Sequence, residues 1–112
     1  MAFEKIKVIV KEPGEPIGHV EIIKNDLQTL QKYVGGMIEC LTLGNVVVIC
    51  NEEGKIFNLP GNFIFGIARK DIIVGTAVIC GADGDGEFAD VPLTVEQWTD
   101  WLKSWGNEIS EE

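Results

Sequence analysis

"DIIVGTAVICG", residues 71–81, is the longest apolar run of the sequence, and it decides the fold that we predict. Its many β-branched residues favour a strand over a helix. We therefore place it at the centre of a sheet. On one face of this strand Gly75 and Ala77 leave the middle nearly bare, with Thr76 on the other face. Something must pack closely against the bare face, and both a helix and a ligand meet that requirement.

Shorter runs of strand type precede this segment, and turns separate them. They are IKVIV (6–10), HVEII (19–23), MIECLTL (37–43) and VVVICN (46–51). In "NEEGK" (51–55), Asn51 suits the first position of a type I turn and Gly54 a left-handed fourth position. We expect a hairpin there, leading into a further strand that starts with "KIFNL" (55–59).

Two amphipathic segments predict helices. The first spans 25–35, with Asn25 as its cap, and the second spans 94–106, with a capping box made by Thr94 and Gln97. In both segments a glycine at the end favours a left-handed exit from the helix. Together with the strands, they give the order β-β-α-β-β-β-β-α.

The second helical segment carries an unusual number of tryptophans on its apolar face. These are Trp98, Trp101 and Trp105, more than one small core usually takes. Two interpretations remain open at this point. The tryptophans either face the core, or they also form an interface to a second subunit or a partner, which would make the protein a homo-oligomer or part of a complex.

The element order predicts an α+β fold, with a single mixed β-sheet of about five to six strands and two helices on one face. A chain of 112 residues suits one domain. We place that domain at residues 1–106 and an acidic C-terminal tail at 107–112. No internal repeat and no linker divides the chain.

The charge of the chain restricts its partners. The formal net charge is −9, from 18 acidic and 9 basic residues, and Arg69 is the only arginine. Duplex nucleic acid needs clustered Lys and Arg, so we exclude it as a partner. An acidic surface either keeps a protein soluble or occupies the basic site of another protein. The start, MAFEKIKVIV, lacks the features of a signal peptide, and no run is long enough to span a membrane, so we expect a soluble cytoplasmic protein.

Motifs for metal binding and catalysis are weak. Cys40, Cys50 and Cys80 lie in apolar runs without a CxxC pair, which is typical of buried free thiols. The acidic segment "GADGDGEF" (81–88) lacks the glycine and the distal glutamate of a calcium loop. His19 and Glu52 have no recognisable nucleophile nearby in the sequence. We therefore predict no enzyme activity, no metal and no cofactor. A small hydrolase or transferase that uses Glu52 or His19 is kept as a weaker hypothesis.

One polar residue has no evident role in the local structure. In "LPGN" (59–62), Pro60 and Gly61 suit the central positions of a type II turn, and nothing in that turn requires an asparagine at position 62. The Asn62 amide can donate and accept a hydrogen bond at once, as the recognition of a base or amide edge requires. A local backbone cap is the alternative. Asn51, by contrast, is explained by its turn.

The chain resembles a known family over nearly its whole length. The matching segments are an opening strand followed by "EPG", then "LQTLQKYVGGMIE", "ICNEEGKIFNLPGN", "DIIVGTAVICG" and a final helix that starts with "LTVEQ". On these segments it is similar to domain of unknown function family 3846. The resemblance implies a small protein of phages, plasmids or other mobile elements of bacteria, and no activity. It also implies a basic residue after Asn62, where Phe63 stands here, so that Arg69 and Lys70 would have to supply positive charge.

Two functions compete on this basis. The first is a non-enzymatic protein that binds a small polar ligand, such as a nucleotide, to withhold a host defence signal in the bacterial cytoplasm. The second is an acidic interaction module that inhibits a host protein by contacting its basic surface. For the first, we predict these ligand-binding residues: Asn51, Glu52, Asn62, Phe63, Arg69, Lys70, Gly75 and Thr76.

Overall fold

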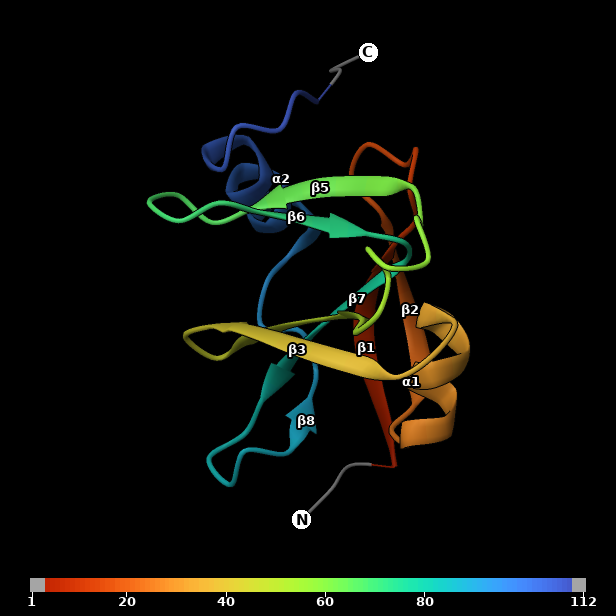
Figure 1. Ribbon diagram of the computed structural model, residues 1–112. Helices are drawn as coiled ribbons and strands as arrows, with labels where there is room; N and C mark the ends of the chain where they lie inside the picture. Colours follow the sequence, from red (N-terminus) through yellow and green to blue (C-terminus); the bar gives the residue numbers. More distant parts are fainter. Residues whose placement is uncertain (1–3, 110–112) are drawn as a thin grey trace.

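The computed structural model describes residues 4–109 and contains two β-sheets and two helices (Figure 1). The larger sheet has six strands in the order β2-β1-β7-β4-β3, with β8 paired to β7. Its strands are β1 (Lys5–Lys11), β2 (His19–Lys24), β3 (Ile38–Leu43), β4 (Val46–Asn51), β7 (Ala77–Ala82) and β8 (Phe88–Ala89). The smaller sheet pairs β5 (Gly61–Phe65) with β6 (Asp71–Val74), and the helices are α1 (Leu27–Val34) and α2 (Val95–Ser104). The predicted α+β class with two helices is thus confirmed, and the second small sheet is an addition.

Residues 71–81 do supply the central strand, but only with their second half. β7 lies between β1 and β4, all pairings between the described strands are antiparallel, and Ala77 is fully buried. The first half is β6, which belongs to the other sheet. The break falls at Gly75, whose φ of +73° disfavours any residue with a Cβ. A Cβ there would lie 2.8 Å from Leu59 Cδ1, so a side chain of the protein itself fills the bare face at Gly75.

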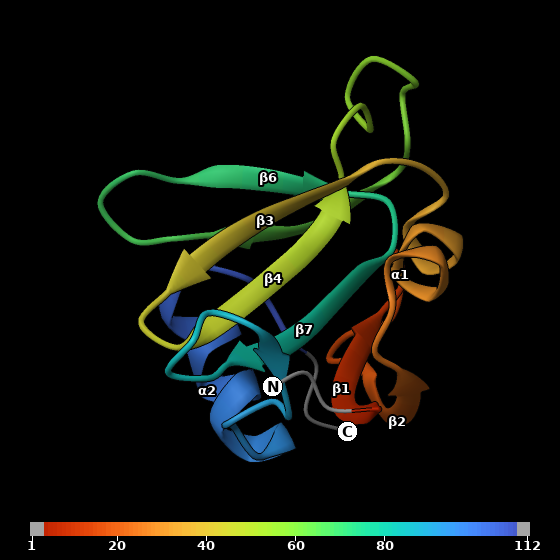
Figure 2. The same ribbon diagram turned by 90° about the horizontal axis from the view of Figure 1, so that it is seen from below.

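The segment after β4 is a projecting loop and not the strand predicted at 55–59 (Figure 2). The predicted turn does start at Asn51, because the Gly54 amide donates to its carbonyl at 3.2 Å. Further bonds of this helical kind continue the turn, and the left-handed residue is Asn58, with φ of 56°, not Gly54. Ile56 and Phe57 are consequently 76% and 63% exposed, since no neighbouring strand covers them.

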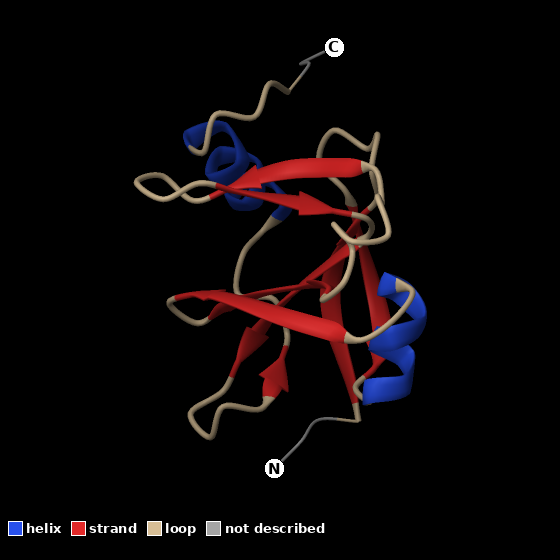
Figure 3. Cartoon of the chain, viewed as in Figure 1, coloured by secondary structure: helices blue, strands red, loops and turns tan. Residues whose placement is uncertain are grey.

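The two helices cover opposite faces of the larger sheet, not one face as predicted (Figure 3). Along β4, Val46 and Val48 belong to the core beneath α2 and the small sheet, whereas Val47 and Ile49 belong to the core beneath α1. This alternation follows from the two-residue period of a strand, and it explains why β4 is apolar throughout.

The caps of the helices differ in how well the sequence predicts them. The capping box of α2 is present, since Thr94 Oγ1 accepts from the Gln97 amide at 3.0 Å and Gln97 Oε1 accepts from the Thr94 amide at 2.9 Å. The cap of α1 is Asp26, which accepts from the Thr29 amide at 2.8 Å. Asn25, the predicted cap, instead donates to the carbonyl of Phe88 at 3.1 Å.

The tryptophans face the core. Trp98 and Trp105 are fully buried and pack around Phe63, with Trp98 edge-on to its ring at a centroid distance of 5.6 Å. Only Trp101 is partly exposed, and it too packs against this core. Of the two interpretations, the core-facing one therefore holds for Trp98 and Trp105, because their side chains are buried in the core of the chain and are not available for an interface.

The predicted tail begins with residues that belong to the fold. Asn107 Nδ2 donates to the carbonyls of Ile64 and Leu102, both at 2.9 Å, and its Oδ1 accepts from the Ile64 amide at 2.8 Å. Ile109 packs against the core beneath α2. The remainder of the predicted tail, 110–112, lies outside the described residues.

Candidate functional site

The structure distributes the predicted ligand-binding residues over separate surface cavities. Asn62 and Phe63 line one cavity, and Gly75 and Thr76 line another. The remaining pairs, Asn51 with Glu52 and Arg69 with Lys70, line two neighbouring cavities beside β6, which share Leu41 and Asp71. A single site made of all these residues is therefore not formed, and each cavity has to be judged by its own chemistry.

The cavity at Asn62 and Phe63 is built where β1 ends. It has a volume of about 340 Å³ and lies among the last residue of β1, the loop 12–18, the start of β5 and the chain after α2. The lining residues are Lys11, Gly14, Glu15, Pro16, Asn62, Phe63, Asn107 and Glu108. We call it the Lys11 cavity.

Lys11 is the unusual residue of this cavity, because it carries a charge that the fold does not neutralise. Only 3% of its surface is exposed. Its Nζ donates to the carbonyl of Glu15 at 2.7 Å and to Asn62 Oδ1 at 2.8 Å, and lies 5.4 Å from the centroid of the Phe63 ring. Among the described residues, no carboxylate lies within ion-pair distance of this ammonium. Buried charges in proteins are normally paired.

The surroundings of Lys11 act on its proton affinity in two opposite ways. Burial lowers the pKa of the ammonium, because the charged form loses its hydration. The negative charge of Glu15 acts in the other direction, but it does not offset the loss. An anion placed in the cavity would supply a countercharge within ion-pair distance of the ammonium, which the carboxylates of Glu15 and Glu108 in the cavity wall do not.

Asn62 positions this lysine. Its Nδ2 donates to the carbonyl of Lys11 at 2.7 Å and to the carbonyl of Gly75 at 2.8 Å, while its Oδ1 accepts from Lys11 Nζ. The predicted type II turn before it is not formed, since Gly61 has no left-handed φ and pairs with Val74 in the small sheet. Asn62 is therefore required by the tertiary structure and not by a turn.

The loop 12–18 forms one wall of the Lys11 cavity and is tied down at several points. The indole of Trp98 donates to the carbonyl of Ile17 at 3.0 Å. The carboxylate of Glu15 accepts from the Glu12 amide and, through its other oxygen, binds His19 Nδ1, both at 2.8 Å. The loop is thus anchored to the core, to β2 and to the buried lysine.

His19 is part of this anchoring and is not a free base. Its Nε2 lies 2.5 Å from Glu21 Oε2, and Tyr33 donates to the other oxygen of Glu21 at 2.5 Å. The hydrogen bonds that the imidazole donates to the carboxylates of Glu15 and Glu21 raise its pKa. A histidine held between two carboxylates favours its protonated form, which suits a clamp better than a catalytic base.

The other predicted residues have structural partners or lie in the open. Asn51, which is 6% exposed, donates to the carbonyl of Val34 at 3.1 Å and accepts from the Glu53 amide at 2.7 Å. Its amide thus closes the end of α1 against β4. Arg69 and Lys70 lie exposed in the connection between β5 and β6.

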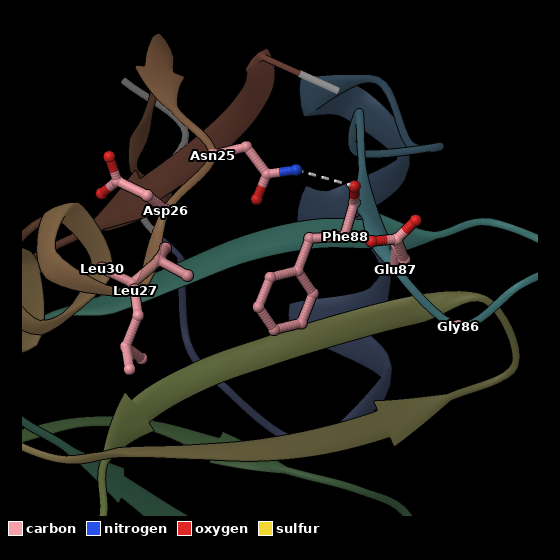
Figure 4. A pocket seen from close by; sticks show the side chains of 7 residues that line it. All are labelled: Asn25, Asp26, Leu27, Leu30, Gly86, Glu87 and Phe88. Atoms are coloured by element: carbon pink, nitrogen blue, oxygen red, sulfur yellow. Dashed lines mark hydrogen bonds between the residues drawn. The ribbon is translucent and has the colours of Figure 1, made fainter. Parts of the chain in front are cut away.

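A further cavity of about 260 Å³ contains none of the predicted residues (Figure 4). Leu27, Leu30 and Phe88 give it apolar walls. Its polar groups are engaged, since Asp26 caps α1 and Asn25 binds the carbonyl of Phe88. The sequence offers little signal for it, because its walls come from α1 and the turn before β8, which are far apart in the chain.

The cysteines do not form a reactive cluster. Burial raises the pKa of Cys50 to about 11 and that of Cys80 to about 12, as expected for thiols that pack like small apolar side chains. Cys40, predicted to be buried, is exposed because β3 lies at the edge of its sheet. Within residues 4–109, no group of His, Cys, Asp and Glu is arranged to hold a metal ion, and no helix is long and apolar enough to cross a membrane.

Comparison with protein families gives one match. The family described as "Domain of unknown function (DUF3846)" matches residues 6–103. The chain belongs to this family. The match includes Lys11, Asn62 and Phe63 and ends before Asn107. Neither the curated proteins nor the solved structures gave a match. The description of the family carries no activity.

Proposed function

We propose that this protein is a non-enzymatic binding protein for a small anionic ligand, which it holds in the Lys11 cavity. The observation that carries the proposal is the buried ammonium of Lys11, which borders a cavity of about 340 Å³ and has neutral oxygens and a ring face as its neighbours. A charge of this kind is costly to bury, and a ligand anion removes most of that cost.

The chemistry of the cavity fits a carboxylate or a phosphate. An ammonium has three hydrogen-bond donors, and the contacts to Glu15 and Asn62 use two of them. The third can serve a ligand oxygen, and such charge-assisted bonds are stronger than bonds between neutral groups. Pro16 and Phe63 provide apolar surface for the body of the ligand, in the usual pattern of a small-molecule site.

The net charge of −9 opposes the approach of an anion, so the local arrangement must overcome it. The carboxylate of Glu15, which lines the cavity together with Glu108, is held by His19 and the Glu12 amide. The ammonium itself lies in a poorly hydrated site, where its attraction for an anion is screened little by salt. We therefore expect slow association and weak dependence of the affinity on ionic strength.

Several observations favour binding without turnover. Both ring nitrogens of His19 are engaged by carboxylates, and the thiols of Cys50 and Cys80 have raised pKa values. A site with a cation and amides can hold a ligand, but hydrolysis or group transfer also needs a positioned base or nucleophile.

The narrower predictions concern the ligand and its setting. Ligand cavities commonly measure about 300–1,000 Å³, so the Lys11 cavity suits a ligand no larger than a mononucleotide or the phosphate end of a larger one. A nucleotide signal of a bacterial host fits this class. The setting in a mobile element and the withholding of that signal are proposals that follow from the ligand, once it is known.

Native mass spectrometry of the purified protein tests the proposal directly. The protein is incubated with inorganic phosphate and with a panel of nucleotides that includes cyclic dinucleotides and ADP-ribose. The same panel is applied to Lys11→Met, which keeps most of the length of the unbranched side chain and removes the charge. Lys24→Met, at the exposed end of β2, is the matched control.

We expect a retained and chemically unaltered adduct with the parent protein and with Lys24→Met, and none with Lys11→Met. An adduct that survives in Lys11→Met would place the ligand elsewhere. A chemically changed ligand would show an enzyme, and a bare mass against the whole panel would reject the proposed ligand class.

A further inference from the structure

A second surface, far from the Lys11 cavity in the order of the sheet, has unused hydrogen-bonding capacity in its backbone. Among the strands of residues 4–109, β3 is the last of the larger sheet and pairs with β4 alone, while β6 pairs with β5 alone. Figures 1 and 2 show both strands along the same side of the molecule, one belonging to each sheet. Each strand thus has one free edge, and cavities lined by residues of both strands form a groove between the sheets.

Two adjoining cavities form this groove. The cavity beside Asn51 and Glu52 has a volume of about 150 Å³, and the cavity beside Arg69 and Lys70 about 450 Å³. They meet at Leu41 of β3 and Asp71 of β6, which line both. Leu41 and the half-buried Phe65 give the groove an apolar floor, and the exposed Ile56 and Ile72 stand at its rim.

The backbone of β3 can accept another strand. A two-residue turn joins Leu43 to Val46, which makes these two a hydrogen-bonded pair. Pairs of this kind alternate along an antiparallel ladder, so we expect Cys40 and Thr42 to direct their N–H and C=O groups away from β4. Side chains at Glu39 and Leu41 then flank the groove, on the face where an added strand would place every second side chain.

The charges along the groove are ordered. Lys55 and Asp71 form an exposed ion pair at 2.7 Å in its middle. Glu39 and Glu52 lie toward one end and have no cation within ion-pair distance among residues 4–109. Arg69 lies toward the other end, likewise without a carboxylate at that distance. The groove is thus acidic at one end and basic at the other.

We infer that β3 accepts an extended segment of a partner protein as an additional strand, with apolar side chains in the groove, a Lys or Arg opposite Glu39 and Glu52, and an Asp or Glu opposite Arg69. Main-chain hydrogen bonds to the edge of β3 supply the binding, and the side-chain positions in the groove supply the selectivity. This surface is independent of the Lys11 cavity.

The experiment is a selection of displayed random nine-residue peptides against the whole protein, followed by amide hydrogen exchange of the protein with the selected peptides. We expect the peptides to carry a basic and an acidic residue at opposite ends, and to protect the amides of Cys40 and Thr42.

In Thr42→Pro the edge of β3 loses an outward N–H while the ladder to β4 is kept, so the affinity falls at least about tenfold. Ile22→Ser, an exposed change on the opposite edge strand, leaves the affinity unchanged.

A thermal unfolding curve confirms that Thr42→Pro is folded, and Glu39→Lys provides a second variant that leaves the backbone intact. The Glu39→Lys variant should bind peptides that carry a basic end more weakly than the parent protein does. The inference is wrong if the library yields no binder, if the binders protect amides of β2 instead, or if they bind Thr42→Pro as tightly as the parent protein.

Discussion

Lys11 at the end of β1 and Asn51 at the end of β4 are the two buried polar residues of residues 4–109, and they differ in how the fold satisfies them. Asn51 is neutral, and its amide joins two backbone groups, the carbonyl of Val34 and the amide of Glu53. Lys11 is charged, and its neighbours leave that charge without an opposite one. The architecture therefore explains Asn51 completely. It explains the position of Lys11 but not its charge, and the uncompensated charge points to a ligand.

The largest change in stability is expected at Phe63, which lies between the Lys11 cavity and the core. Phe63 lies under the ammonium and packs against Trp98 and Trp105. Phe63→Ala should lower the free energy of unfolding by about 3–5 kcal/mol, because it leaves a void among large rings. Urea unfolding measures this change. Phe57→Ala, at the exposed loop tip, is the control and should change it by less than about 0.5 kcal/mol. Similar losses of unfolding free energy in both variants would mean that Phe63 does not link the cavity to the core.

Asn51→Ala separates the two buried residues by stability. It leaves a buried carbonyl and a partly buried amide without partners, so we expect a loss of about 1–3 kcal/mol in the free energy of unfolding. Ligand binding in the Lys11 cavity should be unchanged. Asn25→Ala, which removes a bond at a partly exposed site, should cost less in the same urea experiment. A loss of ligand binding in Asn51→Ala would show that Asn51 serves the ligand site as well as the fold.

In Lys11→Met we expect the opposite pattern. Binding is lost, while stability changes little because removing the cost of a buried charge offsets the loss of the hydrogen bonds to Glu15 and Asn62. The pH dependence shows the reason. The folded pKa of Lys11 is lowered, so between that value and the ordinary value near 10.5 the unfolded chain binds more protons. Stability from this residue therefore rises with pH in that window. The melting temperature of the parent protein should rise relative to Lys11→Met as the pH increases. If the melting temperatures of the two proteins change with pH in the same way, burial does not lower the pKa of Lys11.

The smallest effect concerns the clamp on the loop 12–18. The pKa of His19 is raised above 6.5, so its contribution to stability is complete below that value and is lost as the pH rises through the folded pKa. We expect the indole N–H of Trp98, which binds Ile17, to exchange faster with solvent above that pH. Proton NMR of this signal follows the change. Base catalysis speeds the exchange of any indole N–H as the pH rises. In His19→Gln only the additional acceleration near the histidine pKa should be absent, and a profile identical to that of the parent protein would exclude the histidine as the anchor.

The sequence allows much of the fold to be predicted, because its signals are local. The apolar pattern of β7, the amphipathic faces of the helices and the Thr94–Gln97 box all depend on neighbours within a few positions. The break at Gly75 escapes prediction because the run 71–81 has the same strand character on both sides of it. Which sheet each half joins is decided by distant contacts, such as Leu59 against Gly75.

The candidate site is predicted only in part, and for the same reason. The sequence does single out Asn62 as a residue without a local purpose. It does not single out Lys11, because a lysine between a strand and a proline-rich turn is typical of an exposed position. Its burial depends on Asn62, which is 51 positions away in the chain.

The side chain of Asn107 has a consequence for how copies of this protein can associate. It gives Ile64 of β5 the donor and the acceptor that a neighbouring strand would otherwise provide. A two-stranded sheet with both edges free can be extended by one copy after another, as in a fibril. Here one edge is closed at Ile64 by an amide of the same chain, so stacking through the small sheet ends after a single addition at β6. Asn107 thus blocks the addition of a strand at this edge of β5.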